Sequence, residues 1–316
     1  MLPAGSAQPC NCTRMSELDI RRPFTYQQAI AAGISAGALK RPARFRRLFR
    51  GVYVAAGVGV STSLRAQAAL LLHPPRAFIS HTTSATLQGI TVPIDPQVHV
   101  TVPLERFRRR RSGISTHVRG AATVLTTADG LRLSVGPELF VELAQLLTLM
   151  DLVIAGDALV AQQRIKPHQL VDSPGCGAGP AREAAVLVRE RVESPMETRV
   201  RLLVLWAGFP EPEVNLAIGK GAGSYRLDLC WPELRLAVEY DGQQHRTDMD
   251  QWDSDIRRRE SLQRSGWTIV TLVARDVYRR PAAALDRIFA AWMACGGARF
   301  VMSDDWRPHF GGERAA

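Results

Sequence analysis

The pattern of apolar and polar residues near the start of the chain predicts two short helices followed by two strands. Thr25 stands before a run with helical spacing that ends at Gly33, and Ser35 can cap a second, shorter helix. The stretch "RRLFRGVYVA" then predicts a strand, a turn at Gly51 and a second strand. Helix, turn, helix and hairpin is the order of a winged helix-turn-helix, which we expect over residues 21–60.

The central part of the chain mixes both periodicities, so we expect an α/β domain over residues 61–180. "SLRAQAALLLH" predicts a helix, and "QVHVTVP" predicts a strand that carries its three valines on one face. A helical stretch over residues 137–163 closes the region, and the segment "VDSPGCGAGPAR", rich in Gly and Pro, predicts a domain boundary.

The last third of the chain predicts a helix, three strands, a helix and a strand. Ser194 is a natural N-cap, Pro195 suits the first helical position and Glu197 falls at the third. The strands are expected at "PEVNLAIG", "YRLDLCW" and "RLAVEYDG", followed by a helix at about 250–265 and the strand "WTIVTLV". We assign residues 185–298 to this domain, residues 1–20 to a loose leader and residues 299–316 to a tail.

The net charge of the chain indicates which kind of partner it binds. A formal net charge of +10 favours an anionic partner, and nucleic acid leads because no apolar stretch is suited to a membrane. The N-terminus lacks the features of a signal peptide, which predicts a cytoplasmic protein without a membrane partner. Five scattered cysteines do not describe a disulfide framework.

A dense basic run joins the second predicted helix to the predicted hairpin. Beside a helix-turn-helix pattern such a run suits contact with DNA phosphates, although a solvated basic loop remains the simpler alternative. The helix is short, so contacts to the backbone are better supported than base recognition. The candidate DNA-binding residues are Lys40, Arg41, Arg44, Arg46, Arg47 and Arg50.

A second basic cluster, Arg106–Arg111, is expected at the tip of a hairpin in the central region. His81, His99 and His117 lie in the same region, but none has a ligand partner at helical spacing. We therefore expect these histidines to be structural or to lie on the surface.

In the last third of the chain, three carboxylates lie among aliphatic residues of predicted strands. Glu239 and Asp241 share one face of a predicted strand, and Asp228 lies on the strand before it. If these strands pair, the like charges converge and repel, and a divalent cation with a preference for oxygen ligands, Mg²⁺ or Mn²⁺, relieves the repulsion. The alternative is that the carboxylates face solvent or pair with arginines.

Other polar residues could belong to the same site. Glu197 has a complete explanation as a capping residue, and a role as metal ligand stays open beside it. His245 could act as a general acid or base, or be an ordinary loop histidine. Arg257 and Arg258 could contact nucleic acid, or form surface ion pairs with nearby aspartates.

The blocks "SPMETRVRLLVLWAGFPEPE", "RLDLCWPELRLAVEYDGQQH" and "WDSDIRRRESLQRSGWTIV" resemble an uncharacterised family related to very-short-patch-repair endonucleases, within the PD-(D/E)XK nuclease superfamily. The resemblance implies a restriction-endonuclease-like core with Asp228 and Glu239 as metal ligands and Glu197 as the glutamate of the first helix. It also implies magnesium-dependent hydrolysis of DNA. Asp241 departs from the pattern, because the superfamily normally has lysine there.

The N-terminal half resembles the abortive-infection type IV antitoxin family through "FTYQQAIAAGIS", "RRLFRGVYV" and "FISHTTSATLQGI". This resemblance implies DNA binding, and a cognate toxin or a repair protein as a further partner. Together the patterns predict a DNA endonuclease directed by a winged helix. The alternative is a DNA-binding regulator of the antitoxin type whose nuclease fold is inactive.

Overall fold

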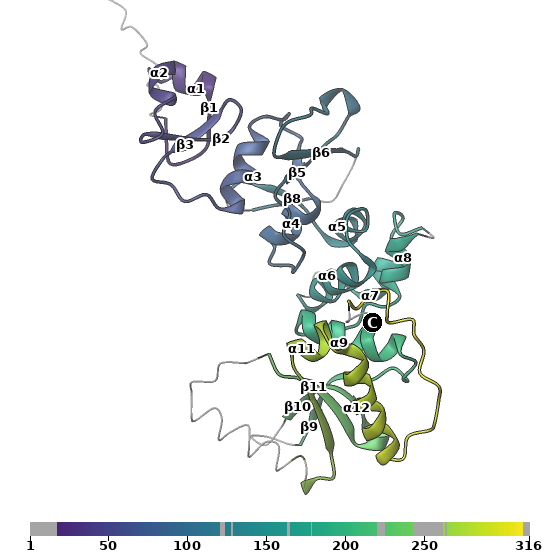
Figure 1. Ribbon diagram of the computed structural model, residues 1–316. Coiled ribbons are helices and arrows are strands. Elements are labelled where there is room, and N and C mark those ends of the chain that lie inside the picture. The colour runs from purple at the N-terminus through teal and green to yellow at the C-terminus, as the bar shows by residue number, and fades with distance from the viewer. Residues whose placement is uncertain are drawn as a thin grey trace, which may run out of the picture. The chain divides into compact units, whose positions relative to one another are not determined.

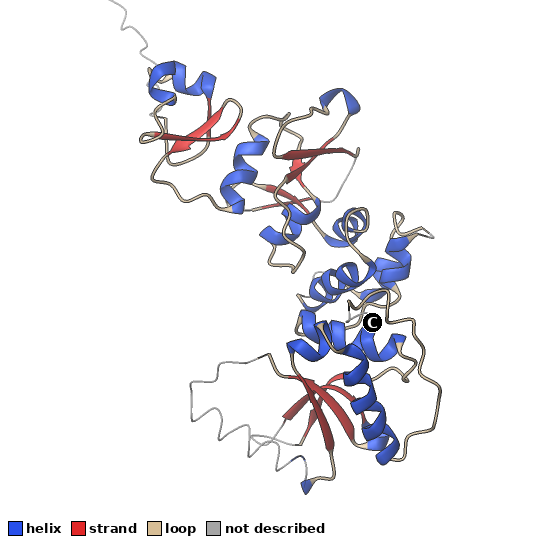
Figure 2. Ribbon diagram, viewed as in Figure 1, coloured by secondary structure: helices blue, strands red, loops and turns tan. Residues whose placement is uncertain are grey.

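The computed structural model describes residues 18–120, 124–127, 129–162, 165–177, 179–219, 225–242, 262 and 264–311 (Figure 1). The chain divides into two compact units. One comprises Met1–Thr83 and Asp95–Leu133, and the other Ser84–Ile94 and Ser134–Ala316. The mixed α and β class is confirmed, because helices alternate with three separate sheets (Figure 2).

The first unit begins with the predicted order of two helices and two strands. After the short strand β1 (Phe24–Thr25) come the helices α1 (Tyr26–Ala31) and α2 (Ala36–Leu39) and the strands β2 (Phe45–Phe49) and β3 (Val52–Ala55). The side chains of Thr25 and Ser35 accept hydrogen bonds from the first turns of α1 and α2, as their positions predict. The strands form a sheet in the order β1-β3-β2.

A small aromatic core holds this sheet to its helices. Phe24 and Phe45 are buried and meet edge to face, with ring centroids 5.8 Å apart. Ala29 and Leu39 pack against the same cluster from α1 and α2. In β2 the buried Phe45 and Phe49 stand at the two ends of the strand, and Arg46 and Arg47 between them are exposed to solvent.

The first unit continues with a helix and most of a five-stranded sheet. Its elements are α3 (Thr62–Leu70), β4 (Phe78–Ile79), α4 (His81–Leu87), β5 (Val98–Val102), the 3-10 turn η1 (Glu105–Phe107), β6 (Ile114–Val118), β7 (Val124–Thr126) and β8 (Arg132–Ser134). The strand order is β6-β5-β4-β8-β7. Two of these elements, α4 and β8, contain residues that belong to the second unit.

The predicted hairpin around Arg106–Arg111 is wrong. β5 and β6 pair in parallel, with Val98 beside Ile114 and Val102 beside Val118, so the basic segment belongs to a crossover connection. All five residues of β5 are buried, not only its three valines. A strand at this position in the sheet is covered on both faces, which is typical of strands with a parallel neighbour.

In the second unit, two helices occupy the stretch where the sequence predicted one continuous helix. Residues 137–163 include two helices, α5 (Gly136–Leu143) and α6 (Leu149–Ala161), because Thr148 accepts a hydrogen bond from the backbone of Asp151 and starts a new helix. The Gly- and Pro-rich segment then lies between α7 (Pro167–Val171) and α8 (Pro180–Ala185). These helices pack together and α8 packs on α6, so the described part of this segment belongs to a compact unit.

The rest of the second unit is built on a four-stranded sheet. Its elements are α9 (Pro195–Trp206), β9 (Glu213–Ile218), β10 (Tyr225–Trp231), the 3-10 turn η3 (Pro232–Leu234), β11 (Leu236–Tyr240), β12 (Thr268–Leu272), α11 (Ala274–Tyr278) and α12 (Pro281–Ala294). The strand order is β12-β11-β10-β9, in which only β11 and β12 are parallel. α9 and α12 both pack against this sheet. The helix expected at about 250–265 falls mostly outside the described residues.

The segment predicted as a tail, residues 299–316, packs on the second unit over its described part. Phe300 meets Phe209 edge to face at 4.9 Å. Trp306 and Phe310 are each only 5% exposed and belong to the same core cluster as α9 and α12. Residues 299–311 therefore complete the hydrophobic core of this unit.

Candidate functional site

The strand register brings two of the predicted carboxylates side by side. β10 and β11 are antiparallel and pair Leu229 with Val238, so the next position along each strand sets Asp228 beside Glu239. The backbone N–H of Tyr240 donates a hydrogen bond of 2.9 Å to Oδ2 of Asp228. This contact fixes the orientation of the Asp228 carboxylate at the edge of β11.

On its other side Asp228 faces Asn215 of β9. The pairs Leu227–Leu216 and Leu229–Val214 bracket the two residues in the register of β10 and β9. Asn215 is 7% exposed and has a φ of 49°, in the left-handed region that Asn tolerates better than most residues. Its amide donates hydrogen bonds to Oε2 of Glu197 (2.7 Å) and to the carbonyl of Arg191 (2.6 Å).

Glu197 lies at the start of α9, with its side chain directed to the sheet. Its backbone N–H donates to Oγ of Ser194 at 3.2 Å, which confirms the predicted N-cap. Its carboxylate accepts from the backbone N–H of Glu193 at 2.9 Å as well as from Asn215. Glu197 therefore takes part in the capping contacts at the start of α9 and also lies beside β9. Glu197, Asn215, Asp228 and Glu239 form a row across α9, β9, β10 and β11 (the carboxylate row).

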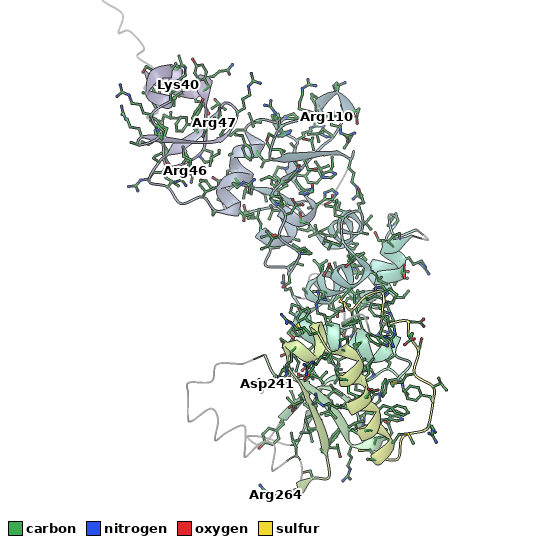
Figure 3. The ribbon with its side chains drawn as sticks, viewed as in Figure 1. Lys40, Arg46, Arg47, Arg110, Asp241 and Arg264 are labelled. Atoms are coloured by element: carbon green, nitrogen blue, oxygen red, sulfur yellow. The ribbon has the colours of Figure 1, made fainter. Side chains whose placement is uncertain are left out.

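Asp241 follows β11, and its backbone N–H donates to the carbonyl of Leu272 at 2.8 Å (Figure 3). Asp228, Glu239 and Asp241 are all half-buried. Burial raises the pKa of the neighbouring Tyr240 phenol, with smaller contributions from Tyr278 and Asp241. Among the described residues these carboxylates do not make a group of three whose ligand atoms lie close together. Of these carboxylates, Asp228 and Glu239 are the two that the register of β10 and β11, continued by one position, places opposite each other.

Three of the predicted site residues, His245, Arg257 and Arg258, lie outside the described residues. Asn215 was not predicted, because a single Asn in an apolar strand carries no signal that sets it apart. Its position became significant only through the pairing of β9 with β10.

The six basic residues of the N-terminal region are all exposed. Lys40, Arg46 and Arg47, which are labelled in Figure 3, line an open pocket of about 500 Å³ together with Tyr53. An aromatic ring among exposed cations is a suitable surface for a phosphate chain. Arg41, Arg44 and Arg50 lie in the same stretch of chain and are exposed as well.

Comparison with known proteins identifies the class of the C-terminal fold. Residues 212–292 match REase_MTES_1575, a restriction-endonuclease-like family. The matched range includes β9 to β12 and most of α12, and with them Asp228, Glu239 and Asp241. The second unit thus carries a nuclease-type fold, as the resemblance of the sequence implied.

Two proteins of Mycobacterium tuberculosis are similar over a longer range. They are the uncharacterized proteins Rv2248 of strain ATCC 25618 / H37Rv and MT2308 of strain CDC 1551 / Oshkosh, each 30% identical over 213 residues. The similarity covers 65% of this chain and 78% of each relative. The chain belongs to their family. None of its described helices is both long and apolar enough to cross a membrane.

The three histidines of the central region, which were expected to be structural or to lie on the surface, lie close together in the fold. His81, His99 and His117 come from three different elements and have one ligand nitrogen each within 4.8 Å of the others. Neither His81 nor His99 is a surface residue, because they are 2% and 3% exposed. Burial, together with the nearby charges of His99 and Arg108, lowers the pKa of His117 to about 4, so its imidazole is neutral at neutral pH.

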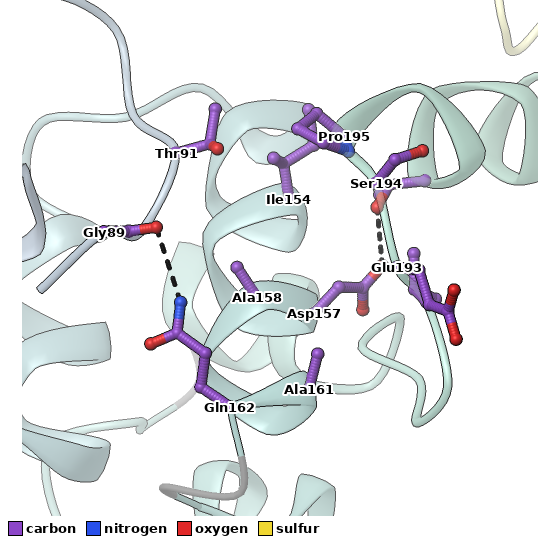
Figure 4. A pocket seen from close by; sticks show the side chains of 12 residues that line it. Gly89, Thr91, Ile154, Asp157, Ala158, Ala161, Gln162, Glu193, Ser194 and Pro195 are labelled. Carbon is purple, nitrogen blue, oxygen red and sulfur yellow. Dashed lines mark hydrogen bonds between the residues drawn. The ribbon is translucent and has the colours of Figure 1, made fainter.

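A pocket of about 300 Å³ in the second unit has Glu193 and Ser194 in its lining, but not the predicted metal ligands Asp228 and Glu239 (Figure 4). It is lined mainly by α6 and by the residues that lead into α9, and Gln162 closes one side through a hydrogen bond to the carbonyl of Gly89. Asp157 on its wall is bonded to Thr198 and Arg201, at 2.8 and 2.9 Å. These contacts give Asp157 a structural explanation.

Proposed function

We propose that this protein is a metal-dependent endonuclease that hydrolyses phosphodiester bonds in DNA, of the very-short-patch-repair type. The observation that carries the proposal is the position of Asp228 in the sheet of a nuclease-type fold, where it accepts a hydrogen bond from the backbone of Tyr240 and the strand register, continued by one position, places it opposite Glu239. Two acidic side chains side by side are costly without a cation, and this fold generally uses divalent metals.

The residues of the carboxylate row fit a hard cation such as Mg²⁺ or Mn²⁺, because they offer carboxylate oxygens and no sulfur or imidazole ligands. Asp228 and Glu239 would bind the ion, while Glu197 and Asp241 would support the site. A bound ion of this kind polarises a phosphate and activates water. His245 would move the proton to or from the reacting oxygen.

Binding to DNA is assigned to a winged helix over residues 21–60. The support is the order of α1, α2, β2 and β3 and the exposure of all six cations in the loop and strand that follow α2. α2 has only four residues, Ala36–Leu39, and offers little surface for base recognition. The cations would therefore hold the phosphate backbone and leave selectivity to the nuclease unit.

The decisive experiment is cleavage of supercoiled plasmid by the full-length protein with Mg²⁺, with Mn²⁺ and with EDTA. We expect metal-dependent nicking that falls by at least about 100-fold in Asp228→Asn and in Glu239→Gln, since both remove a charged ligand. Asp286→Asn, which changes an exposed aspartate of α12, is the matched control and should cleave normally. Cleavage that survives in both site variants would rule out this site.

The alternative function is that of a DNA-binding regulator of the antitoxin type with an inactive nuclease fold. Asp241 favours it, because a carboxylate stands where the superfamily normally has lysine. Retardation of DNA in a gel, without cutting of supercoiled, mismatched or single-stranded DNA in either metal, would support the regulator and contradict the nuclease.

A further inference from the structure

The first unit contains a cluster of three histidines that is independent of the carboxylate row. His81 begins α4, His99 lies in the middle of β5 and His117 lies in β6. We propose that His81, His99 and His117 bind a divalent transition metal of the zinc type (the three-histidine site). Among the described residues, this is the group of three potential ligands that the fold brings together.

The strand pairing explains how residues so far apart in sequence meet. β5 is parallel to β6 and antiparallel to β4, so it is the shared neighbour of both. The backbone N–H of Ser80 donates to the carbonyl of His99 at 3.1 Å, which sets His81 beside that strand. In β6, His117 lies opposite Thr101, two residues after His99. The start of α4 and the two strands β5 and β6 thus each bring one imidazole to the same place.

Hydrogen bonds to two of the rings determine which of their nitrogens would coordinate. Nε2 of His99 is bonded to the Asp95 carboxylate at 2.7 Å, which leaves its Nδ1 directed at Nε2 of His117, 2.9 Å away. Nδ1 of His81 is bonded to Oγ of Ser80 at 2.9 Å, so Nε2 is the nitrogen that would coordinate. A carboxylate behind a histidine, as Asp95 is behind His99, is the usual support of a metal ligand in proteins.

The distances require a small adjustment. With Zn–N bonds of about 2.0–2.1 Å, two nitrogens of a tetrahedral site lie roughly 3.3 Å apart. The nitrogens of His99 and His117 are 2.9 Å apart, and all three ligand nitrogens lie within 4.8 Å of one another. His81 and His117 are stacked, with ring centroids 3.7 Å apart, and must turn about their side-chain torsions because a metal lies in the plane of each ring that binds it.

The three imidazole ligands determine which metal ions the site would prefer. Imidazole suits Zn²⁺ and other first-row transition metals, whereas Mg²⁺ requires oxygen ligands. His117 is only half-buried, so the ion would be reached from solvent and would keep a coordination position for water. The ion would also join β4, β5 and β6, and its binding energy would add to the stability of the first unit.

The test is a titration of chelator-treated full-length protein with Zn²⁺ by calorimetry and with Co²⁺ by visible absorption. We expect one equivalent of ion at this site, the absorption of tetrahedral Co²⁺ and a rise of the melting temperature with Zn²⁺. His99→Gln should abolish the Co²⁺ spectrum. Asp95→Asn keeps all three ligands and should lower the affinity by about 10- to 100-fold.

Two controls separate this site from others. His168→Gln, which removes an exposed histidine of α7, should bind as the unaltered protein does, and so should Asp228→Asn of the carboxylate row. Absence of binding to the unaltered protein would overturn the proposal. The same holds if His99→Gln binds Co²⁺ with unchanged spectrum and affinity, because the ion would then be held elsewhere.

Discussion

The carboxylate of Glu197 receives hydrogen bonds from two different parts of the chain, the backbone before α9 and the amide of Asn215 in β9. Such a buried acid depends on its donors, because an unsatisfied carboxylate in an apolar environment is costly. Asn215 meets this need and also occupies a left-handed backbone conformation. One residue thus couples the start of α9 to the strand beside Asp228.

Replacement of Asn215 should separate the contribution of its hydrogen bonds to stability from the contribution of its left-handed backbone conformation. Asn215→Ala removes the amide and places a β-carbon at a φ of 49°, so we expect a loss of about 1–3 kcal/mol in the free energy of unfolding. Asn215→Gly removes the same amide but tolerates the backbone conformation, and should lose less. Urea denaturation of the three proteins measures both effects. Equal stability of all three would show that neither contribution matters.

Cys230 provides a second prediction for a single residue. Burial, and then the nearby Glu213 and Glu233, raise the pKa of its thiol to about 12. The reactive thiolate is therefore scarce at pH 8, and iodoacetamide should modify Cys230 in the folded protein far more slowly than the half-buried Cys295. Peptide mass mapping measures both rates, and in urea they should become similar. Equal rates in the folded protein would contradict the assigned burial.

Local signals in the sequence were sufficient to predict elements, but not how they pair. The caps at Thr25, Ser35 and Ser194 were predicted correctly because a cap involves only residues within one turn. The parallel pairing of β5 and β6 was missed because the same alternation of residues suits either direction. The proximity of His99 and His117 was missed for the same reason, since it depends on that pairing.

The contact of α6 with α9 rests on a buried ion pair and leads to a third prediction. Arg201 is fully buried and donates to Asp157 at 2.9 Å, and Asp157 also accepts from Thr198 and from the backbone of Arg189. Asp157→Ala leaves a buried guanidinium without this partner, and should cost about 3–5 kcal/mol in thermal or urea unfolding.

The double variant Asp157→Leu with Arg201→Met tests the reason for that loss. It removes both charges and replaces them with apolar side chains, so it should regain most of the stability lost in Asp157→Ala. If the double variant is as unstable as Asp157→Ala, the loss comes from the altered packing of α6 and α9 and the charge argument fails.

On the scale of the whole molecule, the sequence predicted the class of the C-terminal fold, because the order of its helices and strands can be predicted from local periodicity. It did not predict where the core ends. Trp306 and Phe310 complete the second unit from a segment with no helical or strand periodicity, so only their burial identifies them as core.

The net charge of +10 leads to the last prediction, the dependence of DNA binding on salt. Each phosphate neutralised by a cation releases counterions, which gives a slope of about −0.9 per contact in a plot of log K against log salt concentration. If Lys40, Arg46 and Arg47 each contact one phosphate, the triple alanine variant should bind more weakly and lose roughly 2.7 from the magnitude of its slope.

The matched control changes exposed arginines elsewhere, Arg299→Ala with Arg307→Ala, and lowers the net charge without touching the N-terminal surface. Fluorescence anisotropy with a short labelled duplex measures affinity at several salt concentrations. A long-range effect of net charge alone would reduce the slope in the control variant as well. If the slope falls only in the triple variant, the three residues contact the phosphates directly. At 0.1 M salt, screening limits electrostatic interactions between exposed charges to about 10 Å, so arginines far from the DNA cannot take the place of those at the phosphates.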